Sequence, residues 1–388
     1  MKQTRQVRAR PRVTLVVPVL SEFRRPFFAR LREDMDAAGI EAVVAHGHAY
    51  TRDLSARADT VPVPGAVALP QRSLRIFGRP LVHKRLGPLL RSSDVLVVDQ
   101  ALRNVELYPQ LVRQRIGRGP AIAMWDHGRT YCKPQSAVEQ AAKFALTRRA
   151  RWFFAYTEGG ARSVVARGFP AERTTVVQNA IDSLALRAAC QAVTVDQLRD
   201  FRARHGLTPG RTALFVGALS RDKRIPELLA AAEEAARLLP GFRLLVAGRG
   251  ELEGQVLRAA SRSAAVVPLG QVFGEGKALL GAASELMLMP GLVGLCAVDS
   301  FALQTPLVTT DWPFHAPEFE YLRHGGNAWI APGDPAGFAR EVVALLGDSA
   351  RLETLRRGCR EDAPRYTVEE MSRRFTEGTV RLLRETGR

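Results

Sequence analysis

Two positively charged residues, Arg221 and Lys223, follow a short apolar run that ends at Gly217. The run has the composition of a buried β-strand, and a helical pattern begins after it near Pro226. In α/β proteins a turn of this kind binds phosphate, because backbone N–H groups at the start of the helix point back toward the turn. The spacing therefore predicts an anion site at the end of this strand.

The segment 285–311 repeats the arrangement. A buried strand leads into a loop that contains Gly291 and Gly294, and a helix with Asp299 near its start follows. A turn at Pro306 then leads into another buried strand. Two adjacent strand ends, one cationic and one glycine-rich with a carboxylate, suit the two halves of a nucleotide diphosphate sugar.

The elements that must hold these residues alternate along the whole chain. Apolar strand-like runs and amphipathic helical runs alternate from Val13 to Val177, and the alternation resumes at Thr212 after a polar, helical, linker-like stretch, 183–210. Strands that are apolar on both faces indicate a parallel sheet covered by helices on both sides. We therefore predict an α/β fold built from two doubly wound, Rossmann-like domains.

The break in the pattern places the domain boundary near residue 180. We predict a first domain over residues 1–182 and a second over 183–373, with the last helix, 374–388, packing back on the first. Ligands of such domains bind at the carboxyl ends of the strands. We expect the two edges to face each other across a cleft.

Composition excludes several classes of protein. The chain has 388 residues, of which 46% are hydrophobic and 24% charged, which argues against disorder and against repeat architectures. The apolar stretches are too short to span a membrane, and the run after the basic start reads as a strand rather than a signal peptide. The four cysteines show no paired spacing, so neither a metal site nor a disulfide framework is expected, and reduced thiols point to the cytoplasm.

The net charge of +17 concerns partners more than fold. Nucleic acid is disfavoured, because the arginines are spread along the chain without a basic helix and base-stacking aromatics. The basic stretches 2–12 and 71–91 fit a peripheral surface that touches anionic lipid headgroups on the inner face of a membrane. Phosphate-rich substrates and simply solvated arginines remain alternatives.

Five segments resemble, in order and spacing, the family 4 glycosyltransferases of the GT-B fold. They are residues 156–182, 215–231, 244–256, 288–311 and 315–322. The turn at 124–128, with sequence MWDHG, resembles one branch of that family. The resemblance implies a retaining, metal-independent enzyme without a cofactor. Such an enzyme moves a sugar from a nucleotide diphosphate donor, UDP- or GDP-linked, to a hydroxyl of a polysaccharide, a lipid-linked glycan or a small-molecule natural product.

Residue roles follow from the same resemblance. Lys223, with Arg221 beside it, would hold the donor diphosphate, and Asp299 would accept hydrogen bonds from the ribose hydroxyls. His127 would face the donor sugar and the acceptor. The structural alternatives are a solvated turn lysine, a carboxylate that complements a helix dipole and a turn histidine.

The remaining candidates line the same two edges. On the donor side they are Gly217, Gly248, Gly250, Val272, Gly294 and Leu295; on the acceptor side they are Arg24, Arg25 and Asp126 together with His127. His315 and Glu318 match a family loop that is more often structural than catalytic.

Two departures from the family pattern bear on function. The first glutamate of the family's paired motif has no counterpart, because the segment from Pro290 to Asp299 is about three residues short. The contact to the donor sugar is therefore in doubt, and a sugar-nucleotide epimerase of the same fold or a catalytically decayed nucleotide-sugar binding protein stays open. The first strand also lacks the glycine pair that many relatives place under the diphosphate, where Arg24 or Arg25 could substitute.

Overall fold

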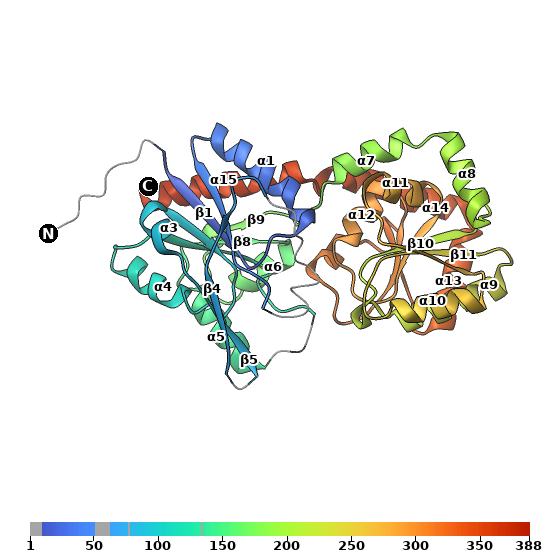
Figure 1. Ribbon diagram of the computed structural model, residues 1–388, viewed down its shortest axis with the longest axis horizontal. Coiled ribbons are helices and arrows are strands. Elements are labelled where there is room, and N and C mark those ends of the chain that lie inside the picture. Colours follow the sequence, from blue (N-terminus) through green and yellow to red (C-terminus); the bar gives the residue numbers. More distant parts are fainter. Residues whose placement is uncertain (1–9, 51–62, 77, 133, 135) are drawn as a thin grey trace. The chain divides into compact units, whose positions relative to one another are not determined.

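The computed structural model describes residues 10–50, 63–76, 78–132, 134 and 136–388 (Figure 1). The chain folds as two compact units. The first comprises the residues up to Thr130, then 134–179 and the C-terminal Val368–Arg388; the second comprises Ala180–Thr367 and the short piece Tyr131–Lys133. We predicted boundaries at 182 and 373, whereas these units divide after Asn179 and after Thr367.

The first unit contains a seven-stranded parallel sheet in the order β3-β2-β1-β6-β7-β8-β9. Its strands are β1 (Arg12–Val17), β2 (Glu41–His46), β3 (Val67–Ala68), β6 (Val95–Val98), β7 (Ala121–Asp126), β8 (Trp152–Ala155) and β9 (Thr174–Val176). Every residue of β6 and β8 is buried, as expected for strands covered on both faces.

Helices cover this sheet, and the last one comes from the far end of the chain. They are α1 (Arg25–Ala37), α3 (Gly87–Ser92), α4 (Leu107–Arg115), α5 (Ala137–Thr147), α6 (Glu158–Val165) and α15 (Val368–Thr386). The C-terminal helix α15 packs beside α1, where the Ser372 hydroxyl donates to Asp34 Oδ2 at 2.6 Å and the Phe27 and Phe375 ring centres lie 6.0 Å apart.

An antiparallel hairpin, β4 (Gln71–Ile76) and β5 (Arg79–Lys84), stands outside the parallel sheet. In Figure 1 it is the long ribbon labelled β4 and β5 in the first unit. The sequence predicted only a basic stretch here, because the period-2 alternation of a half-buried strand is absent from β4, in which five of six residues are exposed.

The second unit contains a six-stranded parallel sheet in the order β12-β11-β10-β13-β14-β15. Its strands are β10 (Thr212–Val216), β11 (Arg243–Ala247), β12 (Val266–Gly270), β13 (Leu286–Met289), β14 (Leu307–Thr310) and β15 (Ala328–Ala331). Its helices are α7 (Ser183–Ala192), α8 (Val195–His205), α9 (Ile225–Leu238), α10 (Glu253–Arg262), α11 (Gly274–Ala282), α12 (Cys296–Leu303), α13 (Pro335–Leu346) and α14 (Ser349–Asp362).

The stretch that looked like a linker, 183–210, is a folded part of this second unit. Helix α7 packs on α11 and α12, and Leu186 and Phe201 are buried in the unit's hydrophobic core. Its polar composition reflects helices that expose one face.

Strand order reverses at one place in each sheet. In the first sheet β1 pairs with both β2 and β6; in the second β10 pairs with both β11 and β13. The loops that leave two such strands diverge, and the crevice at their carboxyl ends is where doubly wound proteins bind ligands. In the described part of the chain, no helix has both the length and the apolar character needed to cross a bilayer.

Candidate active site

The loops after β10 and β13 lie side by side where the strand order of the second sheet reverses, which we call its switch point. Lys223 lies in a short 3-10 turn (Arg221–Lys223) after β10, and its ammonium donates to the Leu292 carbonyl oxygen at 2.5 Å. The Leu292 N–H in turn donates to the Asp222 carbonyl oxygen at 2.8 Å. The two predicted phosphate-site segments are therefore bonded to each other.

Gly291 explains how these two loops come so close. A Cβ at this position would collide with the carbonyl oxygen of Asp222 and the carbonyl carbon of Lys223. Gly294, in the same loop, is different, since the nearest atom to a Cβ there lies 3.7 Å away. The loop thus leaves no room for a side chain at Gly291.

Helix α12 begins where the β13 loop ends. Its N-cap residue is Leu295, whose side chain cannot accept a hydrogen bond. The N–H groups of Ala297 and Val298 donate instead to the backbone carbonyl oxygens of Gly294 and Leu295, at 3.0 and 2.9 Å. Burial raises the pKa of the Cys296 thiol in this turn, and the nearby Lys223 ammonium opposes that rise while Asp299 and Glu318 add to it. Lys223 and Asp299 are therefore both close enough to the start of α12 to act on the Cys296 thiol.

Asp299 forms an ion pair with a lysine of the neighbouring helix. The ammonium of Lys277, on α11, lies 2.9 Å from Asp299 Oδ1, and both side chains are largely buried. Sequence reasoning missed Lys277, although it is the one cation in the helix Gly274–Ala282. The pairing depends on how α11 packs against α12, which no local pattern reveals.

Arg221 and Lys223 have different surroundings. The Arg221 side chain is 87% exposed and its Nε lies 3.8 Å from Glu251 Oε1, whereas Lys223 is half-buried. The neighbouring Arg224, not predicted, adopts φ +55° and donates to the Gly333 carbonyl oxygen at 3.0 Å. Lys223 is thus the cation that the fold holds in place at the switch point.

Gly248 and Gly250 are explained by the packing of two loops. A Cβ at Gly248 would collide with the Gly217 carbonyl oxygen, and one at Gly250 with the Leu219 backbone. Val272 packs half-buried against the core of the unit. These positions shape the edge of the site.

His315 is hydrogen-bonded to the loop that follows β13. Its Nδ1 accepts from the Val293 N–H at 3.0 Å, which leaves Nε2 to donate to the Thr310 carbonyl oxygen at 2.9 Å. Burial lowers the pKa of this imidazole, and the hydrogen bond to Thr310 opposes the shift. The histidine is therefore a neutral positioning group. Glu318 is buried in the same loop region, with 3% of its surface exposed.

A second cluster of predicted residues lies at the strand ends of the first unit. His127 follows β7, and its ring centre lies 4.6 Å from that of Tyr156, which follows β8. Asp126 accepts from the backbone N–H groups of His127 at 2.6 Å and of Gln100 at 2.9 Å. The carboxylate thereby fixes the turn that carries the histidine.

Arg24 and Arg25, the two arginine candidates of the first unit, have different surroundings. The Arg24 guanidinium donates to Asn179 Oδ1 at 2.5 Å and lies over the rings of Trp125 and Tyr156, at 5.5 and 5.3 Å from their centres. Arg24 therefore belongs to the cluster around His127. Arg25 is exposed at the start of α1.

The turn after β7 also requires glycine. Gly128 has φ +76°, and a Cβ there would collide with the Gly160 carbonyl oxygen at the start of α6. In the sequence this turn was noticed only through the family resemblance. Its contacts Tyr156 and Gly160 come from the next strand and helix, so no local pattern predicts them.

Comparison with known proteins agrees with this architecture. Residues 210–348 match the family model described as Glycosyl transferases group 1. With 95% of this chain and 99% of the other aligned, the structure is similar to HepE of Anabaena in complex with UDP and glucose, with a TM-score of 0.65 and 17% identity. The fold is GT-B.

Two further proteins are similar to this chain. The GT-B sucrose-phosphate synthase of Thermosynechococcus elongatus aligns over 97% of this chain and 100% of its own, with a TM-score of 0.64 and 16% identity. A phosphatidyl-myo-inositol mannosyltransferase of Mycobacterium leprae is 29% identical over 150 residues, which is 37% of this chain and 39% of that protein. The sequence match thus spans well under half of the mannosyltransferase. The switch-point residues of the second unit all lie within residues 210–348, which the family model matches.

Proposed function

We propose that this GT-B protein is a glycosyltransferase that moves a sugar from a nucleotide diphosphate sugar to an acceptor hydroxyl. The observation that carries the proposal is the convergence of Lys223, Asp299 and the first turn of α12 at the switch point of the second sheet. A fixed cation and a helix N-terminus suit a diphosphate, and a carboxylate suits ribose hydroxyls.

The donor is bound by the second unit. The Lys223 ammonium and the positive end of the α12 dipole stabilise the charge that develops on the departing diphosphate, the electrostatic contribution that usually dominates such catalysis. Asp299 Oδ1 is held by Lys277, and its other oxygen accepts from the ribose. UDP- and GDP-linked hexoses are the donors we favour, since HepE is seen with UDP and glucose and the mycobacterial relative is a mannosyltransferase by name.

The acceptor is bound by the first unit through the cluster around His127. The imidazole hydrogen-bonds either the sugar or the incoming hydroxyl, with its turn fixed by Asp126 and its ring packed on Tyr156. Arg24 gives this edge a positive charge. A polysaccharide, a lipid-linked glycan and a hydroxylated natural product all present such a hydroxyl.

Transfer proceeds with retention and without a protein nucleophile in this proposal. The bond from the anomeric carbon to the diphosphate oxygen breaks, and the acceptor oxygen bonds to the same face of that carbon. The hydroxyl proton passes to the departing diphosphate. Positive charge for the leaving group comes from Lys223 and α12, so the proposed mechanism needs neither a metal nor a cofactor.

The test measures binding and turnover in parallel. UDP, GDP and TDP are screened by the shift in melting temperature, and their sugars are then incubated with and without acceptors while nucleotide release is followed. A transferase shows release that depends on the acceptor. An epimerase changes the sugar without an acceptor, and a binding protein gives a thermal shift without release; either result, or no shift at all, contradicts the proposal.

A further inference from the structure

The hairpin β4–β5 lies in a part of the chain that has no acidic residue. From Thr60 to Ser93 the sequence contains neither Asp nor Glu but has six cations. Lys84 is buried, and the other five are exposed: Arg72, Arg75, Arg79, Arg85 and Arg91. Within the described residues, none of these five forms an ion pair with a carboxylate. The proposed transfer reaction uses none of them.

The strand register divides the hairpin into two faces. Ser73 pairs with Val82 and Gln71 with Lys84, and since Val82 and Lys84 are buried, this face is turned toward the body of the unit. The opposite face carries Leu74 and Ile76, which are 64% and 43% exposed. The polar residues of that outer face are Arg72, Arg79 and His83, all exposed.

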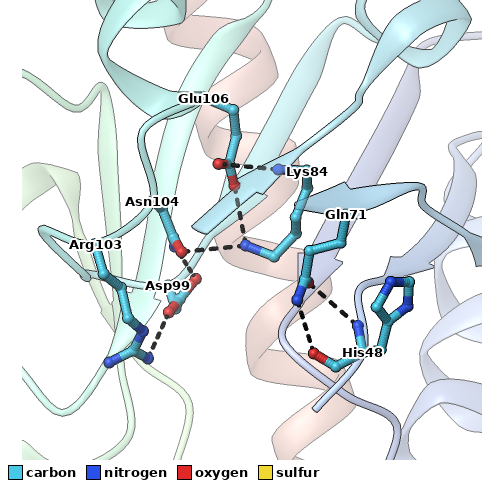
Figure 2. Close-up of polar contacts among 7 residues, drawn as sticks. All are labelled: His48, Gln71, Lys84, Asp99, Arg103, Asn104 and Glu106. Atoms are coloured by element: carbon cyan, nitrogen blue, oxygen red, sulfur yellow. Dashed lines mark hydrogen bonds and ion pairs between the residues drawn. The ribbon is translucent and has the colours of Figure 1, made fainter. Parts of the chain in front are cut away.

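The base of the hairpin is fixed to the unit by polar contacts at the cross-strand pair Gln71 and Lys84 (Figure 2). Gln71 exchanges two hydrogen bonds with the His48 backbone, donating at 2.9 Å and accepting at 3.2 Å. The Lys84 ammonium donates to Glu106 Oε1 at 2.9 Å and to Asn104 Oδ1 at 3.1 Å. A buried lysine is stable only with such partners.

The network of Figure 2 extends beyond Lys84. Asn104 donates to Asp99 Oδ1 at 2.5 Å, and Asp99 Oδ2 pairs with Arg103 at 3.3 Å. The backbone N–H of Val82 also donates to the Arg103 carbonyl oxygen at 2.8 Å. The inner face of the hairpin is thus held by hydrogen bonds to the loop between β6 and α4. The outer face is left exposed.

We propose that the outer face of this hairpin docks the protein on an anionic lipid bilayer. Exposed branched apolar side chains between arginines are the pattern of an interfacial element, because the apolar groups enter the headgroup boundary while the cations pair with lipid phosphates and carboxylates. The absence of acidic side chains over 60–93 gives the charge complementarity. The outer face has no phenylalanine, tyrosine or tryptophan among its described residues, and single-stranded nucleic acid is bound largely by stacking on such rings.

The test uses the full chain, without donor or acceptor, in flotation with vesicles of two compositions. One is phosphatidylcholine alone, and the other contains about one-third phosphatidylserine. We expect binding to the anionic vesicles only, and its loss in about 0.5 M salt. Because no sugar is present, this result is independent of the proposed transferase activity.

Two sets of variants locate the contact. Leu74→Ser with Ile76→Ser should lower the partition coefficient about tenfold, and Arg72→Gln with Arg79→Gln should lower it about thirtyfold. Matched controls in the same unit should leave it within about twofold. The apolar control is Val112→Ser with Val138→Ser, at positions 63% and 80% exposed, and the charge control is Arg113→Gln with Arg115→Gln.

Several results would overturn the proposal. They are equal loss in the controls and the hairpin variants, equal binding to neutral vesicles, and a dimer in solution that Leu74→Ser dissociates. Binding to single-stranded RNA without binding to vesicles would assign the arginines to nucleic acid. Circular dichroism of each variant separates a lost contact from a lost fold.

Discussion

The ammonium of Lys277 lies 2.9 Å from Oδ1 of Asp299, and only 18% and 10% of the two side chains are exposed. The proposed ribose carboxylate is therefore held in one orientation by a residue from the neighbouring helix. The pair also cancels its own charge, so our proposal assigns the diphosphate to Lys223 and the start of α12.

Breaking the pair should affect stability and binding separately. Lys277→Met leaves a largely buried carboxylate without its partner, and we expect a loss of about 2 kcal/mol in the free energy of unfolding, measured in urea. UDP affinity should fall about tenfold, because the carboxylate loses its orientation. The double variant Lys277→Met with Asp299→Leu should regain stability but not UDP affinity. Recovery of both would remove Asp299 from the nucleotide site.

The two cations after β10 should not be equivalent. Lys223→Ala removes the ammonium bonded to the β13 loop, and we expect kcat to fall about a hundredfold or more. Arg221→Ala removes a side chain that is 87% exposed, so we expect less than about a threefold change. Steady-state kinetics with the donor found by screening makes the comparison, and Lys223→Arg tests whether charge alone suffices. Equal effects of both alanines would contradict the assignment of Lys223 as the positioned cation.

Gly291 and Gly294 lie in one loop, so their alanine variants can be compared directly. Gly291→Ala pushes a Cβ into the backbone of Asp222 and Lys223, so we expect a loss of about 2 kcal/mol in stability and at least a tenfold fall in kcat/KM. Gly294→Ala places its Cβ in ordinary contact distance and should change stability by less than about 0.5 kcal/mol. Urea denaturation and kinetics distinguish them. Equal stability of the two variants would show that the close approach of the loops is not required.

Stability should decline as pH falls below about 6.5, the ordinary histidine pKa. Burial lowers the pKa of His315 in the folded state, so between that pKa and 6.5 the unfolded chain binds more protons and stability rises with pH. Protonation also destroys the acceptor at Nδ1, which releases the Val293 N–H and the β13 loop. Because the native imidazole stays neutral until pH reaches its lowered pKa, we expect kcat/KM to fall at lower pH than stability begins to do.

His205 is the control for this pH dependence. Burial also lowers its pKa, but it lies at the end of α8 and bonds no loop of the site. His205→Gln should therefore remove part of the change in stability while leaving the pH profile of kcat/KM intact. His315→Gln should alter both, and an unaltered kinetic profile in that variant would detach His315 from the site.

Residues that depend on local turn chemistry were predicted from the sequence. Gly217, Lys223 and Asp299 lie at strand ends or in the first turn of a helix, where the period of the apolar residues changes. For Gly248 and Gly250 the sequence predicts the turn but not the contact that requires glycine. Sequence indicates a tight turn, but the backbone that they must clear belongs to Leu219 and Gly217 on another loop.

The alternation of apolar strands and amphipathic helices by itself determined the two doubly wound units, because burial on both faces is written into each strand separately. Tertiary structure alone decided which side chains meet. Lys277 reaches Asp299 across 22 positions, Arg24 reaches Asn179 across 155, and the hairpin β4–β5 is fixed by a lysine that finds its carboxylate on a later loop. Such contacts follow from the packing of elements against one another, and packing depends on the whole chain at once.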